Sequence, residues 1–224
     1  MPQSISRGDR PTGATRSIVG VILLIGLFAV RGAAGEKPVS GEATPAADSV
    51  MMLADFNAPA PNNVEGSFGS FYASETEKSY ICVEAIDDSV KHGASGSSLR
   101  LVYDVSKGGT FNGFWMKLGP SDTGNNFNAA PFKKLTFWVK GDEKSGIPHR
   151  FKVELKGDPG TPTGKKYIGD LTDQWTKVEI PLEEFSNQGV DLTKLNEFVI
   201  VFEQRVASPS TAGAIYLDDV SLEK

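Results

Sequence analysis

The chain has 224 residues, of which 39% are hydrophobic and 23% are charged, and its formal net charge is −5. A chain of this length can bury one substantial core or two small ones, and its acidic balance argues against a nucleic-acid partner. The single cysteine, Cys82, excludes an intrachain disulfide. The two histidines, His92 and His149, lie far apart in the sequence, which argues against a zinc site or histidine-based catalysis.

Residues 1–34 have the features of a secretory signal peptide. Three arginines precede an apolar run from Ile18 to Val30, which is shorter than the roughly 20 residues that a membrane-spanning helix needs. The small residues at 32–35 form a suitable cleavage region, and residues 35–48 have the composition of a flexible spacer. We therefore expect a secreted or periplasmic protein with no stable membrane span after cleavage. The alternative is an uncleaved membrane anchor.

Residues 49–224 predict one domain built of short strands separated by Gly, Asn, Asp and Pro. The segments with strand character are 50–56, 66–73, 80–85, 98–105, 111–118, 134–141, 149–156, 165–171, 175–182, 196–203 and 214–222. The helical candidates are short turns at Leu182–Phe185 and Leu192–Leu195. Since parallel sheets need crossover helices, we expect an all-β fold, namely a two-sheet β-sandwich or jelly roll.

Alternation along the strands predicts which side chains face solvent. Successive side chains point to opposite faces, so apolar rows such as Phe114, Met116 and Leu118 leave their neighbours on the other face. We expect one outer sheet face that carries Trp115, Trp138, Lys117, Arg100, Lys152 and Glu154. Tryptophans among charged groups are typical of a surface that stacks on sugar rings and hydrogen-bonds their hydroxyls. The alternative is that the spacer or the loop at 157–166 covers one or both tryptophans.

The sequence predicts no catalytic site. A glycosidase needs two carboxylates about 5–10 Å apart across a cleft, whereas the acidic pairs here, such as Asp218 and Asp219, are adjacent and diverge on a strand. Neither a phosphate-binding glycine loop nor a Gly-x-Ser-x-Gly elbow is present. Cys82 lies in an apolar strand and is expected to pack in the core.

Several segments taken in order carry a resemblance to a known group. The succession FWVKGD, FKVELKGD, WTKVEIPL and YLDDV resembles the carbohydrate-binding-module-like jelly rolls of the galactose-binding fold. The groups most similar in this respect are the family 11 carbohydrate-binding modules and the domain of complex I intermediate-associated proteins. The resemblance covers nearly all of residues 49–224.

This resemblance implies two kinds of site. Modules of this type hold a structural calcium ion where the first and last strands meet, and Ca²⁺ takes six to eight oxygen ligands. The matching positions are Asp55, Asn57 and Asp218, and Asp219 is expected to be solvated. For the sugar site, the resemblance adds a tyrosine, a basic residue and a later aromatic residue: Tyr103, Arg150 and Tyr167.

We therefore expect an exported, non-catalytic protein that binds a glucan-like or cell-surface polysaccharide on a sheet face containing Trp115, Trp138 and Lys152, with calcium as a structural ion. A different class fits the same resemblance: an interaction or assembly domain of the cell envelope whose partner is a secreted or envelope protein. A purely structural envelope protein is a third possibility, and it would have no binding groove.

The signal peptide is directly testable. If residues 1–34 are removed on export, protein purified from its native host begins near Gly35 and lacks the apolar run. Mass spectrometry of the intact protein measures this. Recovery of the chain with its original N-terminus would contradict cleavage.

Overall fold

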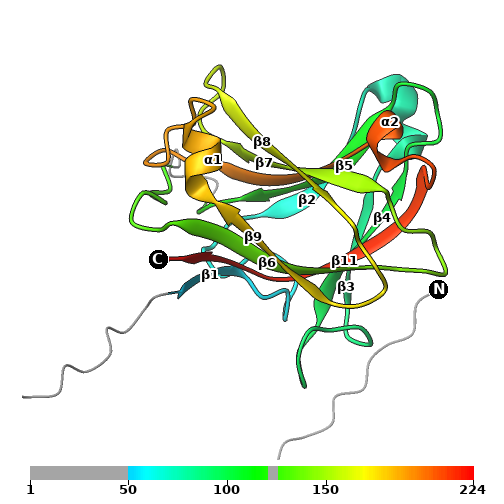
Figure 1. The fold of residues 1–224 in the computed structure, drawn as a ribbon, viewed down its shortest axis with the longest axis horizontal. Helices are drawn as coiled ribbons and strands as arrows, with labels where there is room; N and C mark the ends of the chain where they lie inside the picture. Colours follow the sequence, from blue (N-terminus) through cyan, green and yellow to red (C-terminus); the bar gives the residue numbers. More distant parts are fainter. Residues whose placement is uncertain (1–49, 121–125) are drawn as a thin grey trace, which may run out of the picture. The chain divides into compact units, whose positions relative to one another are not determined.

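The computed structural model describes residues 50–120 and 126–224, so the expected signal peptide and spacer lie outside the described residues. The regular secondary structure of the described part is mainly β, in two antiparallel sheets (Figure 1). The six-stranded sheet contains β1 (Val50–Ala54), β3 (Val83–Asp87), β4 (Ser98–Asp104), β6 (Lys134–Gly141), β9 (Thr176–Pro181) and β11 (Ala212–Glu223). The five-stranded sheet contains β2 (Phe68–Tyr72), β5 (Phe111–Lys117), β7 (Arg150–Lys156), β8 (Thr163–Gly169) and β10 (Glu197–Glu203).

The strand order confirms the predicted two-sheet sandwich. The order is β3-β4-β11-β6-β9, with β1 also beside β11, in one sheet and β2-β5-β10-β7-β8 in the other. The chain repeatedly crosses between the two sheets, so most pairings join segments that are distant in sequence. Each predicted strand segment is present with ends shifted by a few residues. The first helical turn is α1 (Leu182–Ser186), whereas Leu192–Leu195 is only a turn, and sequence reasoning missed η1 (Glu75–Tyr80) and α2 (Gln204–Ala207).

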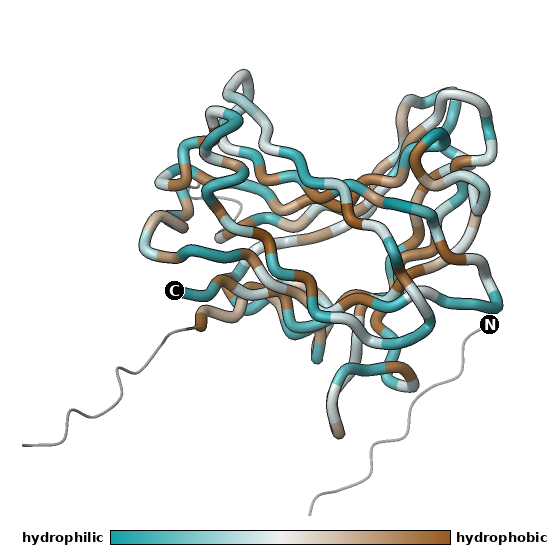
Figure 2. Tube along the Cα trace, viewed as in Figure 1, coloured by the Kyte–Doolittle hydropathy of each residue, from teal (hydrophilic) through white to brown (hydrophobic). Residues whose placement is uncertain are grey.

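The core lies between the inner faces of the two sheets. Apolar and polar residues alternate along many of the strands (Figure 2), as expected when one face is buried. Phe114, Phe151, Phe198 and Leu217 have no more than 1% of their surface exposed. Burying a large apolar side chain of this kind stabilises a fold by about 1.5–3 kcal/mol. Cys82 is also buried, as predicted, and its burial raises the pKa of the thiol to about 12.

Strand β11 changes its neighbour along its length. Its first half pairs with β4, ending at Leu217 opposite Leu99, and its second half pairs with β1, starting at Val220 opposite Ala54. Strand β6 pairs with the other side of β11 along both halves, with a register shift between Asp218 and Ser221. The backbone at Asp219 is left-handed, with φ of 49°, which few non-glycine residues adopt. The two aspartates therefore occupy a β-bulge where β4 gives way to β1.

The loop of residues 88–97 is hydrogen-bonded to this bulge. The backbone N–H of His92 donates to Oδ2 of Asp218 at 2.9 Å, and the N–H of Asp219 donates to Oδ1 of Asp218 at 2.9 Å. The His92 ring lies 2.8 Å from Asp219 through Nδ1 and stacks on Trp138 with centroids 3.9 Å apart. Asp219 is thus bonded to His92 rather than simply solvated. We call Asp218, Asp219, His92 and Trp138 the bulge cluster.

Asp218 is 2% exposed, and its burial raises the pKa of the carboxyl from 3.8 to about 6, although the His92 N–H acts to lower it. The folded chain therefore holds this proton at pH values where the unfolded chain has released it. By linkage, the stabilising contribution of Asp218 is fully present below about pH 4 and is lost as the pH rises to about 6.

Replacing Asp218 by Asn removes this titration. The free energy of unfolding of the wild type, relative to the Asp218→Asn variant, should fall by up to about 3 kcal/mol between about pH 4 and pH 7. Urea denaturation of both proteins at several pH values measures the difference. A difference that stays constant with pH would mean that the pKa of Asp218 is not raised in the folded protein.

Candidate functional site

The two tryptophans that the sequence placed on one face belong to different sheets. Trp115 is on β5 in the five-stranded sheet, and Trp138 is on β6 in the six-stranded sheet. Each points away from the core, so they lie on opposite sides of the sandwich, and the prediction of a shared surface is wrong. Alternation assigns each side chain to a face of its own strand, but it does not indicate which sheet the strand joins.

The other residues of the predicted face divide in the same way. Arg100 on β4 belongs to the sheet of Trp138, whereas Lys117 on β5 and Lys152 and Glu154 on β7 belong to the sheet of Trp115. Among the residues suggested by the resemblance, Arg150 and Tyr167 lie on β7 and β8 of the five-stranded sheet. Four of the six expected sugar-binding residues therefore share the outer face of this sheet: Trp115, Arg150, Lys152 and Tyr167.

Tyr103 is not available to a ligand. It is 1% exposed, its ring stacks on Phe202 with centroids 4.3 Å apart, and its hydroxyl donates to the carbonyl of Ser210 at 2.9 Å. Burial raises the pKa of this phenol. The prediction from resemblance is wrong at this position, because the inner face of β4 carries Tyr103 into the core, as alternation alone would have suggested.

Aromatic rings cover the β2–β5 side of the outer face. Gly69 lies opposite Trp115, and Gly113 lies opposite Phe71. A Cβ atom at Gly69 would lie 3.1 Å from Cζ2 of Trp115, and one at Gly113 would lie 2.8 Å from Cζ of Phe71. Each ring therefore lies over a glycine of the neighbouring strand. Phe111 continues the surface, 6.4 Å from Phe71 between ring centroids. We call Phe71, Phe111 and Trp115 the aromatic shelf.

The shelf lines a hollow of about 490 Å³ together with Val199, Lys117, Glu197 and Lys156. Lys117 Nζ lies 6.0 Å from the centre of the Trp115 ring and 2.5 Å from Oε1 of Glu197. The hollow thus has an aromatic floor on one side and an ion pair on the other. This is the combination of apolar surface and placed polar groups that is common in ligand sites.

Polar and charged side chains form a connected row on the β10, β7 and β8 side of the same face. Lys152 Nζ contacts Oε1 of Glu154 at 2.9 Å and Oε1 of Glu203 at 2.7 Å, and the hydroxyl of Tyr167 donates to Oε2 of Glu203 at 3.2 Å. Lys156 contacts the other oxygen of Glu154 at 3.3 Å. We call these five residues the charged row.

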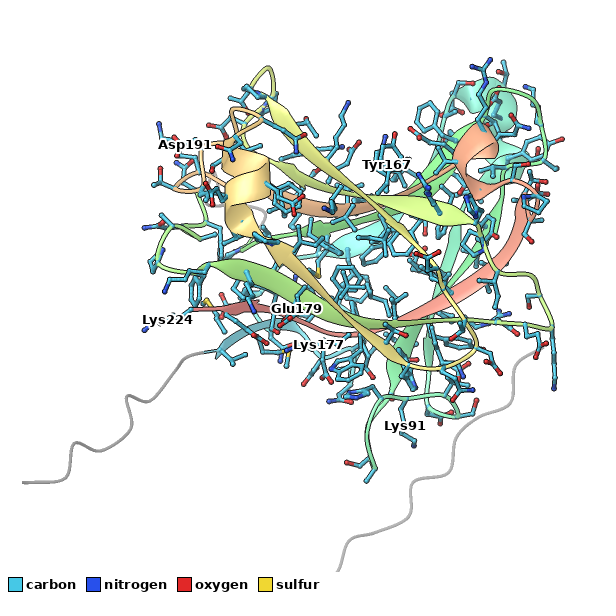
Figure 3. The ribbon with its side chains drawn as sticks, in the orientation of Figure 1. Lys91, Tyr167, Lys177, Glu179, Asp191 and Lys224 are labelled. Atoms are coloured by element: carbon cyan, nitrogen blue, oxygen red, sulfur yellow. The ribbon has the colours of Figure 1, made fainter. Side chains whose placement is uncertain are left out.

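The charged row is partly buried although it lies on an outer face. Lys152 and Glu154 are each 7% exposed. Burial alone would lower the pKa of Lys152, but its hydrogen bonds to Glu203 and Glu154 outweigh this effect and the net shift is upward. Tyr167, at 46% exposed, is the most accessible member, and Figure 3 shows it beside β8, the edge strand of the five-stranded sheet.

Sequence reasoning missed Phe71, Phe111 and Glu203. Glycines and aromatic residues share one strand face in two segments, with Gly69 and Phe71 in GSFGSFY and Phe111, Gly113 and Trp115 in FNGFW. This local pattern could have indicated rings lying beside glycines. Their assembly into a surface depends on the pairing of β2 with β5 and of β10 with β5 and β7. That pairing is set by the fold and not by any single segment.

Two of the expected calcium ligands accept hydrogen bonds from the same loop, residues 88–97. Asn57 accepts a hydrogen bond through Oδ1 from the N–H of Ser97 at 2.9 Å, and Asp218 accepts one from His92 in the same 88–97 loop. Asp55 accepts through Oδ1 from the N–H of Asn57 at 3.2 Å. These are oxygen donors of the kind that Ca²⁺ prefers, but backbone N–H groups already occupy one lone pair on each. No group of three or more His, Cys, Asp or Glu residues suited to a metal occurs in residues 50–120 and 126–224.

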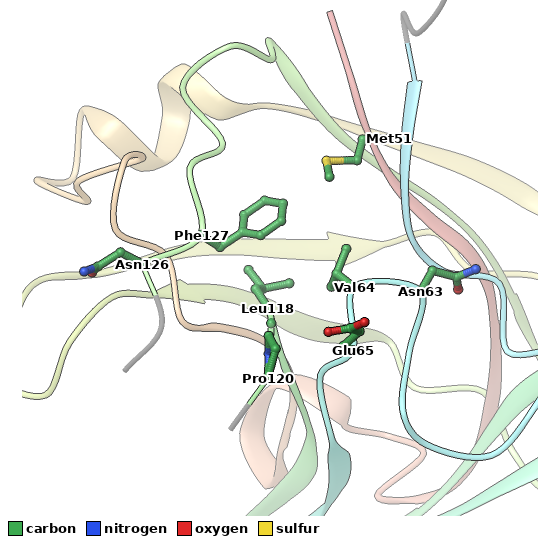
Figure 4. Close-up of a pocket in the computed structure, with 9 residues that line it drawn as sticks. Met51, Asn63, Val64, Glu65, Leu118, Pro120, Asn126 and Phe127 are labelled. Carbon is green, nitrogen blue, oxygen red and sulfur yellow. The ribbon is translucent and has the colours of Figure 1, made fainter. Parts of the chain in front are cut away.

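A second hollow, of about 610 Å³, lies elsewhere on the domain (Figure 4). Met51, Val64, Leu118 and Phe127 supply apolar surface to its described lining, and Asn63, Glu65 and Asn126 supply polar groups. Phe127 is the single aromatic residue of this described lining, whereas the hollow above the aromatic shelf has three. In addition, none of the helices in the described ranges is long and apolar enough to span a membrane.

Comparisons with known structures agree with the jelly-roll fold. The family 11 carbohydrate-binding module of Clostridium thermocellum, in complex with a β-1,3-1,4-mixed-linked tetrasaccharide, is 15% identical, with a TM-score of 0.54 over 78% of this chain and 95% of that one. The family 30 module of the cellulosomal cellulase Cel9D-Cel44B of the same organism is 16% identical, with a TM-score of 0.53 over 78% and 97%. At these identities the similarity establishes the fold alone.

No curated protein sequence matches this chain. A family model does, over residues 62–224, and its description is carbohydrate binding domain 30. The match includes the aromatic shelf, the charged row and all of both sheets except β1. Domains of this type are non-catalytic, in agreement with the absence of a catalytic site expected from the sequence. The chain therefore belongs to the carbohydrate binding domain 30 family.

Proposed function

We propose that this protein is an exported module that binds a glucan-like or cell-surface polysaccharide on the outer face of its five-stranded sheet. The observation that carries the proposal is the aromatic shelf, where Trp115 and Phe71 lie over glycines of neighbouring strands. Rings held flat against a sheet expose their faces, and a sugar ring can stack on such a face. The features of residues 1–34 support export, and a secreted or periplasmic location would give the module access to such polymers.

The charged row supports an uncharged polymer as the ligand. Lys152 contacts Glu154 and Glu203 within 2.9 Å, and Lys156 contacts Glu154 at 3.3 Å. The two positive and two negative charges of the row are therefore largely compensated. These side chains still offer oxygens and N–H groups toward the face, because a carboxylate has about four acceptor sites and an ammonium three donors. Sugar hydroxyls donate and accept, and therefore suit such a mixed surface. The structural neighbour in complex with a β-1,3-1,4-mixed-linked tetrasaccharide makes a β-glucan the first polymer to test.

The rival proposal is a protein partner of the cell envelope. The two proposals differ in what they require of the exposed tryptophans. In the bulge cluster, the His92 ring stacks on the Trp138 ring and covers one side of it. That arrangement leaves Trp138 less suited to a flat sugar platform than Trp115. A glycan array distinguishes the two proposals, since an assembly domain would bind none of the polysaccharides on it.

Replacing Trp115 by Ala should weaken binding to mixed-linkage β-glucan by about 1–3 kcal/mol, a range taken from aromatic stacking on nucleic-acid bases. The fold should be little affected, because the indole lies on the outer face. Isothermal titration calorimetry and thermal melts measure the two effects. Trp138→Ala is the matched control, and we expect it to leave the affinity unchanged and to lower the melting temperature by removing the His92 contact.

Equal loss of affinity in both variants would contradict the assignment of the site to the five-stranded sheet. A normal affinity in the Trp115→Ala variant would remove the aromatic shelf from the proposal. If the array and calorimetry detect no polysaccharide at all, the proposed function itself fails.

We also propose a structural calcium ion at Asp218, with Asp55 or Asn57 as further oxygen ligands. Asn57 and Asp218 contact the same loop, which supports their proximity, and an ion would have to share or replace the N–H bonds they accept. An ion that binds only the folded chain raises the melting temperature according to RT ln(1 + [Ca²⁺]/Kd).

The melting temperature should therefore rise with calcium and fall with a chelator. Asp218→Ala should abolish this response, and Asp219→Ala, whose carboxylate contacts the His92 ring instead, should retain most of it. Differential scanning calorimetry with and without calcium measures both. A wild-type melting temperature that neither calcium nor chelator changes would exclude the ion and leave Asp218 satisfied by N–H groups alone.

A further inference from the structure

The aromatic shelf follows the length of β5. Alternate residues of this strand face outward, namely Phe111, Gly113, Trp115 and Lys117. Phe111 and Trp115 supply rings at the first and third of these positions, and the Phe71 ring of β2 lies over Gly113 at the second. Successive outward positions are about 7 Å apart, and the ring centroids of Phe71 and Phe111 are 6.4 Å apart. The three rings therefore succeed one another in the direction of the strand.

The hollow above the shelf has the same direction. Its lining includes Phe111 and Lys117, which are the first and last residues of β5. Beside β5 it includes Glu197 and Val199 of β10 and Lys156 of β7, but no residue of β8, a strand that the structure describes in full. The hollow thus extends along β5 and does not reach the far edge of the sheet.

A further hollow continues this line beyond the Phe111 end of β5. It has a volume of about 410 Å³ and shares Phe111, which is 42% exposed, with the hollow above the shelf. Gly109 and Thr110, which precede β5, line it on one side, and Gln204 and Arg205 of α2 line it on the other. A ligand that lies along β5 can therefore extend past the end of the strand.

The charged row lies beside the shelf and has the same direction. At one end of the row, Glu203 of β10 lies opposite Phe111. At the other end, Lys156 lies opposite Glu197, which in turn lies opposite Lys117. A chain of sugars along β5 would therefore have rings to stack on and a line of donors and acceptors at one side over its whole length.

A chain laid across the strands would make fewer of these contacts. Phe111 and Trp115 are four residues apart on one strand, a separation of about 13 Å, so a single chain that crosses β5 can meet only one of them. It would then pass over Lys152 and Glu154, which are largely buried and bonded to each other. The crossing path thus exchanges stacking on successive rings for contact with an ion pair that is already satisfied.

We propose that the main chain of the polysaccharide lies along β5, with successive parts of it over Trp115, Phe71 and Phe111, and not across the five strands. The inference rests on the proposed function, because it presupposes that a polysaccharide binds on this outer face. It adds that one ligand contacts both ends of the aromatic shelf at the same time.

Variants at the two ends of the shelf test this direction. The ligands are hexasaccharides of mixed-linkage β-glucan, β-1,4-glucan and β-1,4-mannan, and isothermal titration calorimetry measures their binding. For each hexasaccharide that binds, Trp115→Ala and Phe111→Ala should both weaken binding by about five- to 150-fold, as expected for the loss of one stacked ring. The wild type should bind one hexasaccharide per protein.

Lys165→Ala is the matched control for a crossing chain. Lys165 is exposed on the outer side of β8, on the same cross-strand line as Trp115. A chain that crosses the sheet over Trp115 would reach this lysine and a chain along β5 would not, so the control should keep the wild-type affinity. If thermal melts show that Phe111→Ala disturbs the fold, Phe111→Leu decides, because it removes the ring and keeps an apolar side chain beside Phe71.

The outcomes separate the direction of the ligand from the proposed function. The path along β5 is overturned, with the polysaccharide face left intact, if only one of the two ring variants loses affinity. A comparable loss in Lys165→Ala, or two hexasaccharides bound per protein, overturns it in the same way. No binding of any of the three hexasaccharides to the wild type overturns both.

Discussion

The change of neighbour along β11 is the constraint on which the six-stranded sheet depends. Strand β4 pairs with β11 up to Leu217, β1 pairs from Val220 onward, and β6 spans both halves. The bulge at Asp218 and Asp219 lies at the point on β11 where pairing with β4 ends and pairing with β1 begins. Two adjacent aspartates in a strand are unfavourable on propensity alone. Here Asp218 accepts from the backbone N–H groups of His92 and Asp219, and the Asp219 carboxylate contacts the His92 ring.

The bulge also makes the two outer faces of the sandwich different. On the six-stranded sheet the bulge cluster brings a loop over Trp138, and the Tyr216 ring lies 5.8 Å from the Arg100 guanidinium and 5.9 Å from the Lys140 ammonium. The Trp138 and Tyr216 rings on this face thus already contact neighbouring side chains. On the five-stranded sheet, Tyr167 and Phe111 are among the most exposed large hydrophobic residues of the described chain. The outer face of the five-stranded sheet therefore offers an extended ligand more accessible aromatic surface than the other outer face.

The sequence was sufficient for the fold class and for each strand, because alternation and turn residues are local properties. It also predicted correctly that Trp115, Lys152 and Glu154 point away from the core. The prediction that Trp115 and Trp138 share one face was wrong. Which strands become neighbours depends on pairings between distant segments, such as β2 with β5 and β7 with β10. The same limit explains why Phe71 and Glu203 were not predicted, since they join the site only through those pairings. Tyr103 was assigned to the sugar site from the resemblance, although alternation along its strand placed it in the core.

Aromatic stacking and polar contacts have different consequences for recognition on this surface. Stacking depends little on which sugar lies on the ring, so the aromatic shelf can supply affinity for many polymers. Discrimination must then come from groups with fixed direction. The charged row satisfies itself through short contacts between Lys152, Glu154 and Glu203, and a ligand gains little by replacing them. Discrimination on this face therefore depends on the donor and acceptor sites that the charged row leaves free toward a ligand.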